Sequence, residues 1–154
     1  MKIVDVLQKE CVLADLRSRD KKGVIEELAM PVAGVAGIKH EELVRVLMER
    51  ERLGSTGIGG GVGIPHGKIR DIESLALGFG LSRRGVEFDS MDGRPTYIFF
   101  LMITPENYTG SHLNLLARIA RMLKNESFKE RLLNATDRDE IYSIIKEEDE
   151  AFSG

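Results

Sequence analysis

The sequence contains little of several residue types on which particular classes of protein depend. It has one Cys, four Pro and no Trp in 154 residues. A lone Cys11 can form neither a disulfide within this chain nor a cysteine-based zinc cluster. The longest strongly apolar run, Tyr97 to Ile103, is far shorter than the ~20 residues of a membrane-spanning helix. Charged residues interrupt the N-terminus, which therefore lacks the apolar segment of a signal peptide. These absences predict a cytoplasmic protein without membrane insertion.

A strong excess of charge of one sign is also absent. The chain carries 22 Lys and Arg against 25 Asp and Glu, a formal net charge of -3. This balance gives no electrostatic reason to expect nucleic acid or an anionic membrane as a partner. Hydrophobic residues make up 42% and charged residues 31%, which is typical of a globular protein. Because no repeat or linker interrupts the pattern, we expect one domain over residues 1–154.

The spacing of apolar residues predicts an α/β fold. Helical periodicity indicates helices over residues 20–35, 40–52, 111–123, 126–133 and 137–145. Extended patterns indicate strands over residues 11–16, 74–82, 86–88 and 96–104. Within the first helix Pro31 favours an earlier end, and Ser111 is expected to cap the third. The order of elements predicts a three-layer α/β/α sandwich with a central mixed β-sheet, in which residues 96–104 form a central strand.

Glycine is concentrated in one short stretch. Seven of the 16 glycines lie between Gly54 and Gly67, so this segment cannot form a stable helix and only residues 62–65 favour a short extended piece. Glycine-rich loops often bind phosphate, but two familiar motifs fail on spacing. The dinucleotide-binding fingerprint and the P-loop each require a glycine where this chain has Val62 or Ile64. The stretch must therefore be interpreted from its other residues.

His66 lies near the end of the glycine stretch, between Pro65 and Gly67. Proline fixes its own φ and glycine removes side-chain bulk, so the two neighbours favour an accessible imidazole close to backbone. Neutral imidazole, with a pKa near ~6.5, is a competent nucleophile at neutral pH. N–H groups of the surrounding glycines would hold a phosphoryl group. The alternative is an exposed loop histidine, but the Ile-Pro-His-Gly context favours a phosphoryl acceptor.

Two further residues are candidates for the same site. His112 stands at the expected start of a helix, where an auxiliary imidazole would donate to a phosphoryl oxygen or orient His66. Arg50 or Arg52, just before the glycine stretch, would supply a cation for phosphoryl charge. For each of these residues a partly buried or solvated surface position is the alternative. The three histidines have no metal-ligand spacing, so neither a metal nor another cofactor is expected.

The segment Gly54-Ser-Thr-Gly-Ile-Gly, followed by Val-Gly-Ile-Pro-His66-Gly-Lys, resembles the phosphorylation-site motif of a known family. This family is the fructose/mannitol-type enzyme IIA of the bacterial phosphotransferase system, and within it the chain looks most like the nitrogen-regulatory enzyme IIA proteins. The resemblance implies a mixed sheet between helices and phosphorylation of His66 by an HPr-like phosphohistidine protein. It also implies that His112 is the second active-site histidine and Arg50 the active-site arginine. Gly63 departs from the pattern, because the family usually has Ala there.

Three functions stay open at this point. A nitrogen-branch regulator would act on target proteins that no residue identifies. A sugar-transport enzyme IIA would pass its phosphate to a separate enzyme IIB; no IIB or IIC segment stands in the sequence, which favours the regulator. From a different class, a non-covalent anion or nucleotide sensor would use His66 only as a hydrogen-bond donor.

Overall fold

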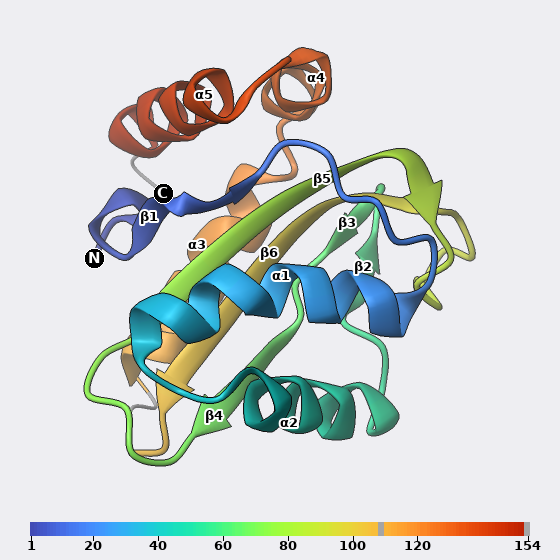
Figure 1. Ribbon diagram of the computed structural model, residues 1–154. Coiled ribbons are helices and arrows are strands. Elements are labelled where there is room, and N and C mark those ends of the chain that lie inside the picture. The colour runs from blue at the N-terminus through green and yellow to red at the C-terminus, as the bar shows by residue number, and fades with distance from the viewer. Residues whose placement is uncertain (108–109, 153–154) are drawn as a thin grey trace.

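The computed structural model describes residues 1–107 and 110–152, with the backbone alone of residues 111 and 112 (Figure 1). The strands are β1 (Leu7–Leu13), β2 (Gly57–Gly59), β3 (Val62–Gly63), β4 (His66–Ile69), β5 (Ala76–Val86) and β6 (Thr96–Pro105). The helices are α1 (Lys21–Ala36), α2 (His40–Arg52), α3 (Gly110–Met122), α4 (Glu126–Asn134) and α5 (Arg138–Ala151), with a short 3-10 helix at Ile3–Asp5. In the described part of the chain, no helix is both long and apolar enough to cross a membrane.

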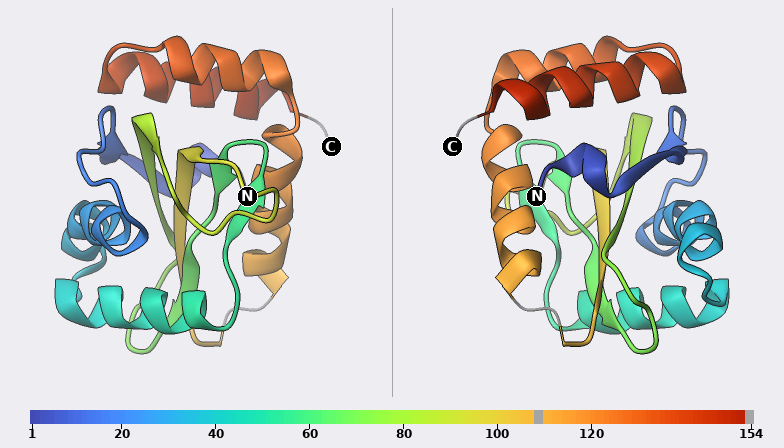
Figure 2. Two further views of the ribbon diagram at one scale, coloured as in Figure 1. Left: turned by 90° about the vertical axis from the view of Figure 1, so that its right-hand side faces the viewer. Right: turned by 90° about the vertical axis from the view of Figure 1, so that its left-hand side faces the viewer.

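The helices surround a single sheet. Figure 2 shows α1 on one face of the sheet and α3 on the opposite face. The helix α2 crosses one end of the sheet, and α4 and α5 lie together across the other end. This arrangement confirms the expected α/β fold with a central mixed sheet between helices.

The strand β6 is central, with β5 on one side and β3 and β4 on the other. It runs antiparallel to β5 and parallel to both β3 and β4, while β1 pairs with β5 in parallel. Register places Val62 opposite Ile98 and His66 opposite Met102, so β4 continues the line of β3 along β6. Between them the Pro65 carbonyl accepts the Met102 N–H at 3.0 Å, which preserves the ladder although proline cannot donate. The glycine stretch thus joins the sheet and delivers His66 to it.

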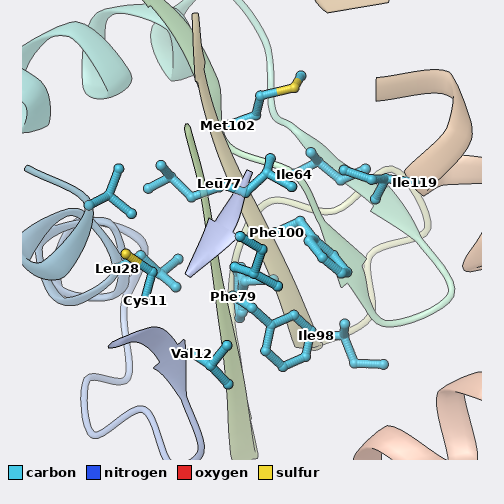
Figure 3. Packing of buried hydrophobic residues seen from close by; sticks show 14 of the residues in the cluster. Cys11, Val12, Leu28, Ile64, Leu77, Phe79, Ile98, Phe100, Met102 and Ile119 are labelled. Carbon is cyan, nitrogen blue, oxygen red and sulfur yellow. The ribbon is translucent and has the colours of Figure 1, made fainter. Parts of the chain in front are cut away.

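Apolar side chains fill the space on both faces of β6. Residues 98–103 are all at most 1% exposed, which confirms the predicted central strand. The rings of Phe79 and Phe100 meet edge to face with centroids 4.9 Å apart (Figure 3). Cys11 is part of this core, where burial chiefly, with a contribution from Glu10, raises the pKa of its thiol to about 11. A thiol that stays protonated at neutral pH is a poor nucleophile, so the role of Cys11 is to pack in the hydrophobic core.

Three predicted boundaries are wrong. The first strand begins at Leu7, four residues before the predicted start at residue 11. Residues 8–10 are polar and exposed at the edge of the sheet, so they lack the apolar pattern from which a strand is predicted. The helix α1 continues through Pro31 to Ala36, since Val32 and its neighbours are buried against the sheet and this packing outweighs a missing helical hydrogen bond. The helix α3 begins at Gly110, so the backbone of Ser111 lies within the helix and not before its first residue, as the expected cap position requires.

The glycine stretch is also more regular than predicted. Besides residues 62–63 it contributes β2 and β4, and the short strand predicted at 86–88 is mostly replaced by the end of β5 at Val86. Pairing to β6 compensates for the weak strand propensity of glycine.

Gly80 allows α1 to approach the sheet closely, and its replacement is expected to be costly. A Cβ at this position would lie 2.8 Å from Leu28 Cδ2 and 2.9 Å from Leu16 Cδ1. We therefore expect Gly80→Ala to lower the free energy of unfolding by about 1–3 kcal/mol in urea denaturation. Gly34→Ala is the control, because no atom lies within 4 Å of its added Cβ and alanine favours the helix by about 0.5–1 kcal/mol. Equal stability of Gly80→Ala and the wild type would contradict this packing.

Candidate functional site

His66 is the first residue of β4, and its side chain is half-buried. The alternative of an exposed loop histidine is therefore wrong, since the parallel ladder to β6 holds the residue in register with Met102. The ring atom Nδ1 lies 2.7 Å from the carbonyl oxygen of Ile64. A carbonyl can only accept, so Nδ1 carries the hydrogen of this bond. In the neutral ring, Nε2 is then the nitrogen that bears the lone pair.

The surroundings of His66 lower the pKa of its imidazole from the ordinary value of 6.5. Burial of the ring is the main cause, and the positive charge of Arg50 acts in the same direction. The hydrogen bond to the Ile64 carbonyl and the negative charge of Glu51 oppose the shift. The net effect keeps the ring neutral, and hence nucleophilic, at neutral pH.

A lowered pKa predicts a specific dependence on pH. As the pH falls, the initial rate of phosphoryl acceptance should reach half of its maximum only below pH 6.5, the ordinary pKa of histidine. In the same range the unfolded chain binds a proton that the folded chain does not, so stability should decrease with acid. An NMR titration of the His66 ring, with rates measured from pre-phosphorylated donor, tests both. A midpoint at or above 6.5 would contradict the description of the site.

Arg50 lies in the last turn of α2 and faces the glycine stretch. Its Nη1 donates to the carbonyl oxygen of Gly54 at 2.8 Å, which fixes the guanidinium at the start of that stretch. The contact of α2 with β4 brings the arginine toward His66, since a Cβ on Gly67 would lie only 3.0 Å from Val46 Cγ1. The structure thus brings together Arg50 and His66, whereas Arg52 is exposed.

The His112 side chain lies outside the residues that the structure describes. Its backbone belongs to the first turn of α3, on the opposite face of the sheet from α1. The role of His112 beside His66 therefore stays a prediction.

Glu51 is a site residue that the sequence analysis missed. Its carboxylate is buried and accepts hydrogen bonds from the backbone N–H of Thr56, at 3.2 Å, and from the Thr56 hydroxyl. Lys21 of α1 pairs with it at 2.9 Å. One signal for this role was present: an acidic residue in the last turn of a helix is unfavourable for the helix dipole and needs a compensating partner.

A continuous series of hydrogen bonds connects this buried ion pair to the imidazole. Glu51 accepts from the N–H of Thr56, the Thr56 carbonyl accepts from the N–H of Ile64 at 3.0 Å, and the Ile64 carbonyl accepts from His66 Nδ1. Each step ties a separate segment to the next. The orientation of the ring is therefore set by contacts that begin between α1 and α2.

The glycines at the β2–β3 turn are needed for their backbone conformation. Gly59, Gly60 and Gly61 have φ values of 93°, 65° and 80°, a region that side chains disfavour. The N–H of Gly60 donates to Asp92 Oδ2 at 3.0 Å, and this bond is the main cause that lowers the pKa of the Asp92 carboxyl group. On the other side, Lys129 Nζ donates to the Gly60 carbonyl at 2.9 Å. The expectation that all these glycine N–H groups hold phosphate is thus wrong for Gly60, because Asp92 already uses its hydrogen.

Gly63, the position that departs from the family pattern, is buried against β6. A Cβ there would lie 3.3 Å from the ring of Phe99 and 3.3 Å from the methyl group of Thr96. Alanine would require these neighbours to move by a few tenths of an ångström. Glycine at this position therefore allows Phe99 and Thr96 to pack close to the backbone.

Comparisons with known proteins find relatives that are similar over most of this chain. A nitrogen regulatory protein of Bradyrhizobium diazoefficiens is 38% identical over 145 residues, which cover 94% of this chain and 95% of the relative. The fructose-specific EIIABC component of Bacillus subtilis is 32% identical over 97% of this chain, which corresponds to 24% of that longer protein. The crystal structure of nitrogen regulatory protein IIA-Ntr from Neisseria meningitidis superposes with a TM-score of 0.87 at 32% identity, covering 92% of this chain and 97% of that one.

A more distant structure shares the fold. Enzyme IIAMtl of Escherichia coli, solved in complex with phosphorylated enzyme IIBMtl, has a TM-score of 0.78 at 19% identity, covering 92% of this chain and 99% of that one. Residues 5–148 match the family model described as phosphoenolpyruvate-dependent sugar phosphotransferase system, EIIA 2. The match spans every strand and most of every α-helix, and it confirms the resemblance to this family: the chain belongs to the EIIA 2 family of the phosphotransferase system.

Proposed function

We propose that this protein is a phosphoryl carrier that accepts a phosphoryl group on Nε2 of His66 from the phosphohistidine of an HPr-like protein. The observation that supports it most is the 2.7 Å contact of Nδ1 with the Ile64 carbonyl, which fixes the tautomer and makes Nε2 the nucleophile. The lowered pKa of the ring supports the same role, because only neutral imidazole attacks.

The transfer exchanges one phosphorus–nitrogen bond for another. The lone pair of Nε2 attacks the phosphorus, the bond to the donor imidazole breaks, and the departing donor nitrogen takes its electron pair. The phosphorylated ring keeps its hydrogen on Nδ1, and the Ile64 carbonyl stabilises the positive charge that the ring acquires. No proton has to move during the step. Catalysis then depends mainly on positioning and on stabilisation of phosphoryl charge.

Arg50 is proposed to stabilise that charge, with His112 as an auxiliary imidazole. The guanidinium is already held at Gly54, so little freedom is lost when it contacts a phosphoryl oxygen. We expect Arg50→Ala to slow labelling of His66 by about 10- to 100-fold and Arg50→Lys to restore part of the rate. Stopped-flow or rapid-quench labelling with phosphorylated donor gives the rates. Labelling by Arg50→Ala at the wild-type rate would contradict this role.

The carrier function can be tested directly. The protein is incubated with phosphorylated HPr, or with its nitrogen-branch counterpart, and acid-labile phosphate is measured. Transfer of about one phosphoryl group per chain is the expected result for a single acceptor histidine. A wild-type protein that stays unlabelled by both donors would contradict the proposal.

Within this class we propose a nitrogen-branch regulator acting on separate target proteins. Relatives named nitrogen regulatory proteins, at 38% and 31% identity over most of their own length, support it. The fructose-specific EIIABC relative favours the second candidate, a sugar-transport enzyme IIA. Mixing the phosphorylated protein with a fructose-type enzyme IIB distinguishes the two: the regulator retains its phosphate, and the transport component transfers it.

A further inference from the structure

A basic cleft lies at the end of β5 that is remote from His66. It has a volume of about 520 Å³ and is lined by residues 15–19, between β1 and α1, and by residues 82–84 of β5. Figure 1 shows the connection between β1 and α1 passing beside this end of β5. Four arginines line the cleft, namely Arg17, Arg19, Arg83 and Arg84.

The first wall of the cleft is fixed by backbone contacts. The N–H of Leu16 donates to the carbonyl of Leu81 at 2.7 Å, which ties the two lining segments together. The Glu27 carboxylate of α1 accepts the N–H groups of Arg17 and Ser18 at 3.0 Å and 2.6 Å. The backbone of this wall is therefore already ordered before any ligand binds, which reduces the entropic cost of binding.

The second wall is equally constrained. Arg83 donates from Nη1 to the carbonyl of Leu133 at 2.9 Å and from Nη2 to that of Ala135 at 2.6 Å, both at the C-terminal end of α4. The Ser82 hydroxyl accepts the N–H of Gly85 at 3.1 Å. These bonds fix the side chain of Arg83 and the segment of β5 on either side of Arg84.

Positive charge in the cleft is only partly balanced. Among residues 1–107 and 110–152, no carboxylate forms an ion pair with Arg17, Arg19 or Arg84. Glu27 uses both of its oxygens on backbone N–H groups, and Asp15 is the one acidic residue that lines the cleft. Four arginines thus line the cleft beside the carboxylates of Asp15 and Glu27, an excess of positive charge in a chain whose net charge is -3. The guanidinium group of Arg83 already donates to two carbonyls of α4, so Arg17, Arg19 and Arg84 are the arginines proposed to contact a ligand. An excess of positive charge in a cleft favours an anionic ligand.

We propose that this cleft binds a pyrophosphate group, either free or as part of a nucleotide. The planar guanidinium fork matches phosphate oxygens, and two adjacent phosphoryl groups supply enough negative charge for arginines from both walls. The volume of about 520 Å³ lies within the range of small-molecule sites, ~300–1,000 Å³.

This site is separate from the proposed phosphoryl acceptor. His66 pairs with Met102, which pairs across β6 with Leu77 of β5. From Leu77 to Ser82 the strand advances by roughly 16 Å, and β5 and β4 flank opposite edges of β6. The inference therefore does not rest on the phosphorylation of His66.

Isothermal titration calorimetry at low salt tests the proposal with pyrophosphate, ADP, AMP and inorganic phosphate. We expect saturable one-to-one binding of pyrophosphate and ADP, at least about tenfold tighter than of AMP or phosphate, because only the first two contain adjacent phosphoryl groups. Tighter binding of ADP than of pyrophosphate would identify a nucleotide, and the reverse would identify the free anion. Affinity should decrease as salt is added.

Single substitutions locate the binding site. Arg17→Ala and Arg84→Ala should each weaken binding by about 10- to 100-fold, while Arg45→Ala, which removes an exposed arginine of α2, should leave it unchanged. His66→Ala should bind pyrophosphate with wild-type affinity, and labelling of His66 should persist in both cleft variants. Absence of saturable binding, or equal binding by the cleft variants and the wild type, would overturn the proposal. Loss of binding in His66→Ala would do the same, since it would place the anion at the glycine stretch.

Discussion

His66→Ala incubated with phosphorylated HPr-like donor is expected to acquire no acid-labile phosphate, whereas the wild type should acquire about one phosphoryl group per chain. This is the largest effect that the site predicts, because the substitution removes the attacking atom, Nε2. Loss of a nucleophile from a covalent transfer leaves no alternative route of comparable rate. Phosphate released on acid treatment, or an intact-mass shift, measures the result.

The chain provides its own controls, since it has three histidines. His40→Ala should label at the wild-type rate, because His40 lies at the start of α2 with Nε2 2.9 Å from the Glu26 carbonyl. Circular dichroism should show His66→Ala folded, as the ring is only half-buried and its hydrogen bond to Ile64 lies within the same short segment. Label that persists in His66→Ala and disappears in His112→Ala would assign the acceptor to His112 and refute the site.

Glu51→Ala is expected to have the second largest effect. It leaves the buried N–H and hydroxyl of Thr56 without their acceptor and removes one carboxylate from Lys21, whose side chain is only 17% exposed. Breaking a buried pair from one side costs about 3–5 kcal/mol. Lys21 keeps a second pair with Asp89 at 3.2 Å, so we expect the lower end of that range. Urea denaturation gives the change in the free energy of unfolding.

A positioning role for Glu51 predicts more than a loss of stability. Glu51→Gln retains an acceptor for Thr56, so it should recover part of the stability and of the labelling rate. The pKa of His66 should fall further in Glu51→Gln, because the negative charge of Glu51 raises it. Glu49→Ala is the matched control: its exposed pair with Arg45 should contribute at most about 0.5 kcal/mol. Unchanged stability and an unchanged His66 pKa in both Glu51 variants would contradict this role.

The elements that sequence alone predicts best are those in which local pattern and burial agree. The helix α2 has the predicted bounds, His40–Arg52, because its apolar stripe is flanked by charged residues throughout. The continuous apolar run of β6 likewise predicts its central position. At β1 the exposed residues 8–10 mask the strand, and at Pro31 tertiary packing outweighs a local helix breaker. Neither outcome is encoded in the nearby residues alone.

The site was predictable to a similar extent. The glycine-rich motif predicts His66 as the acceptor. Arg50 is predicted because it lies just before this stretch in the sequence. The role of Glu51 depends on Lys21, which is thirty residues away and is brought near only by the packing of α1 on α2. The tautomer of His66 depends on the carbonyl of Ile64, whose direction follows from the pairing of β3 and β4 with β6. Sequence spacing carries no information on either contact.

Nε2 of His66 is proposed to receive the phosphoryl group because Ile64 holds the hydrogen on Nδ1. The most direct test is NMR of the ¹⁵N-labelled protein before and after phosphorylation. We predict an Nδ1–H tautomer for the His66 ring at first, and then coupling of phosphorus to Nε2 of the same ring. Coupling to Nδ1, or a phosphoryl group on any other residue, would contradict the account.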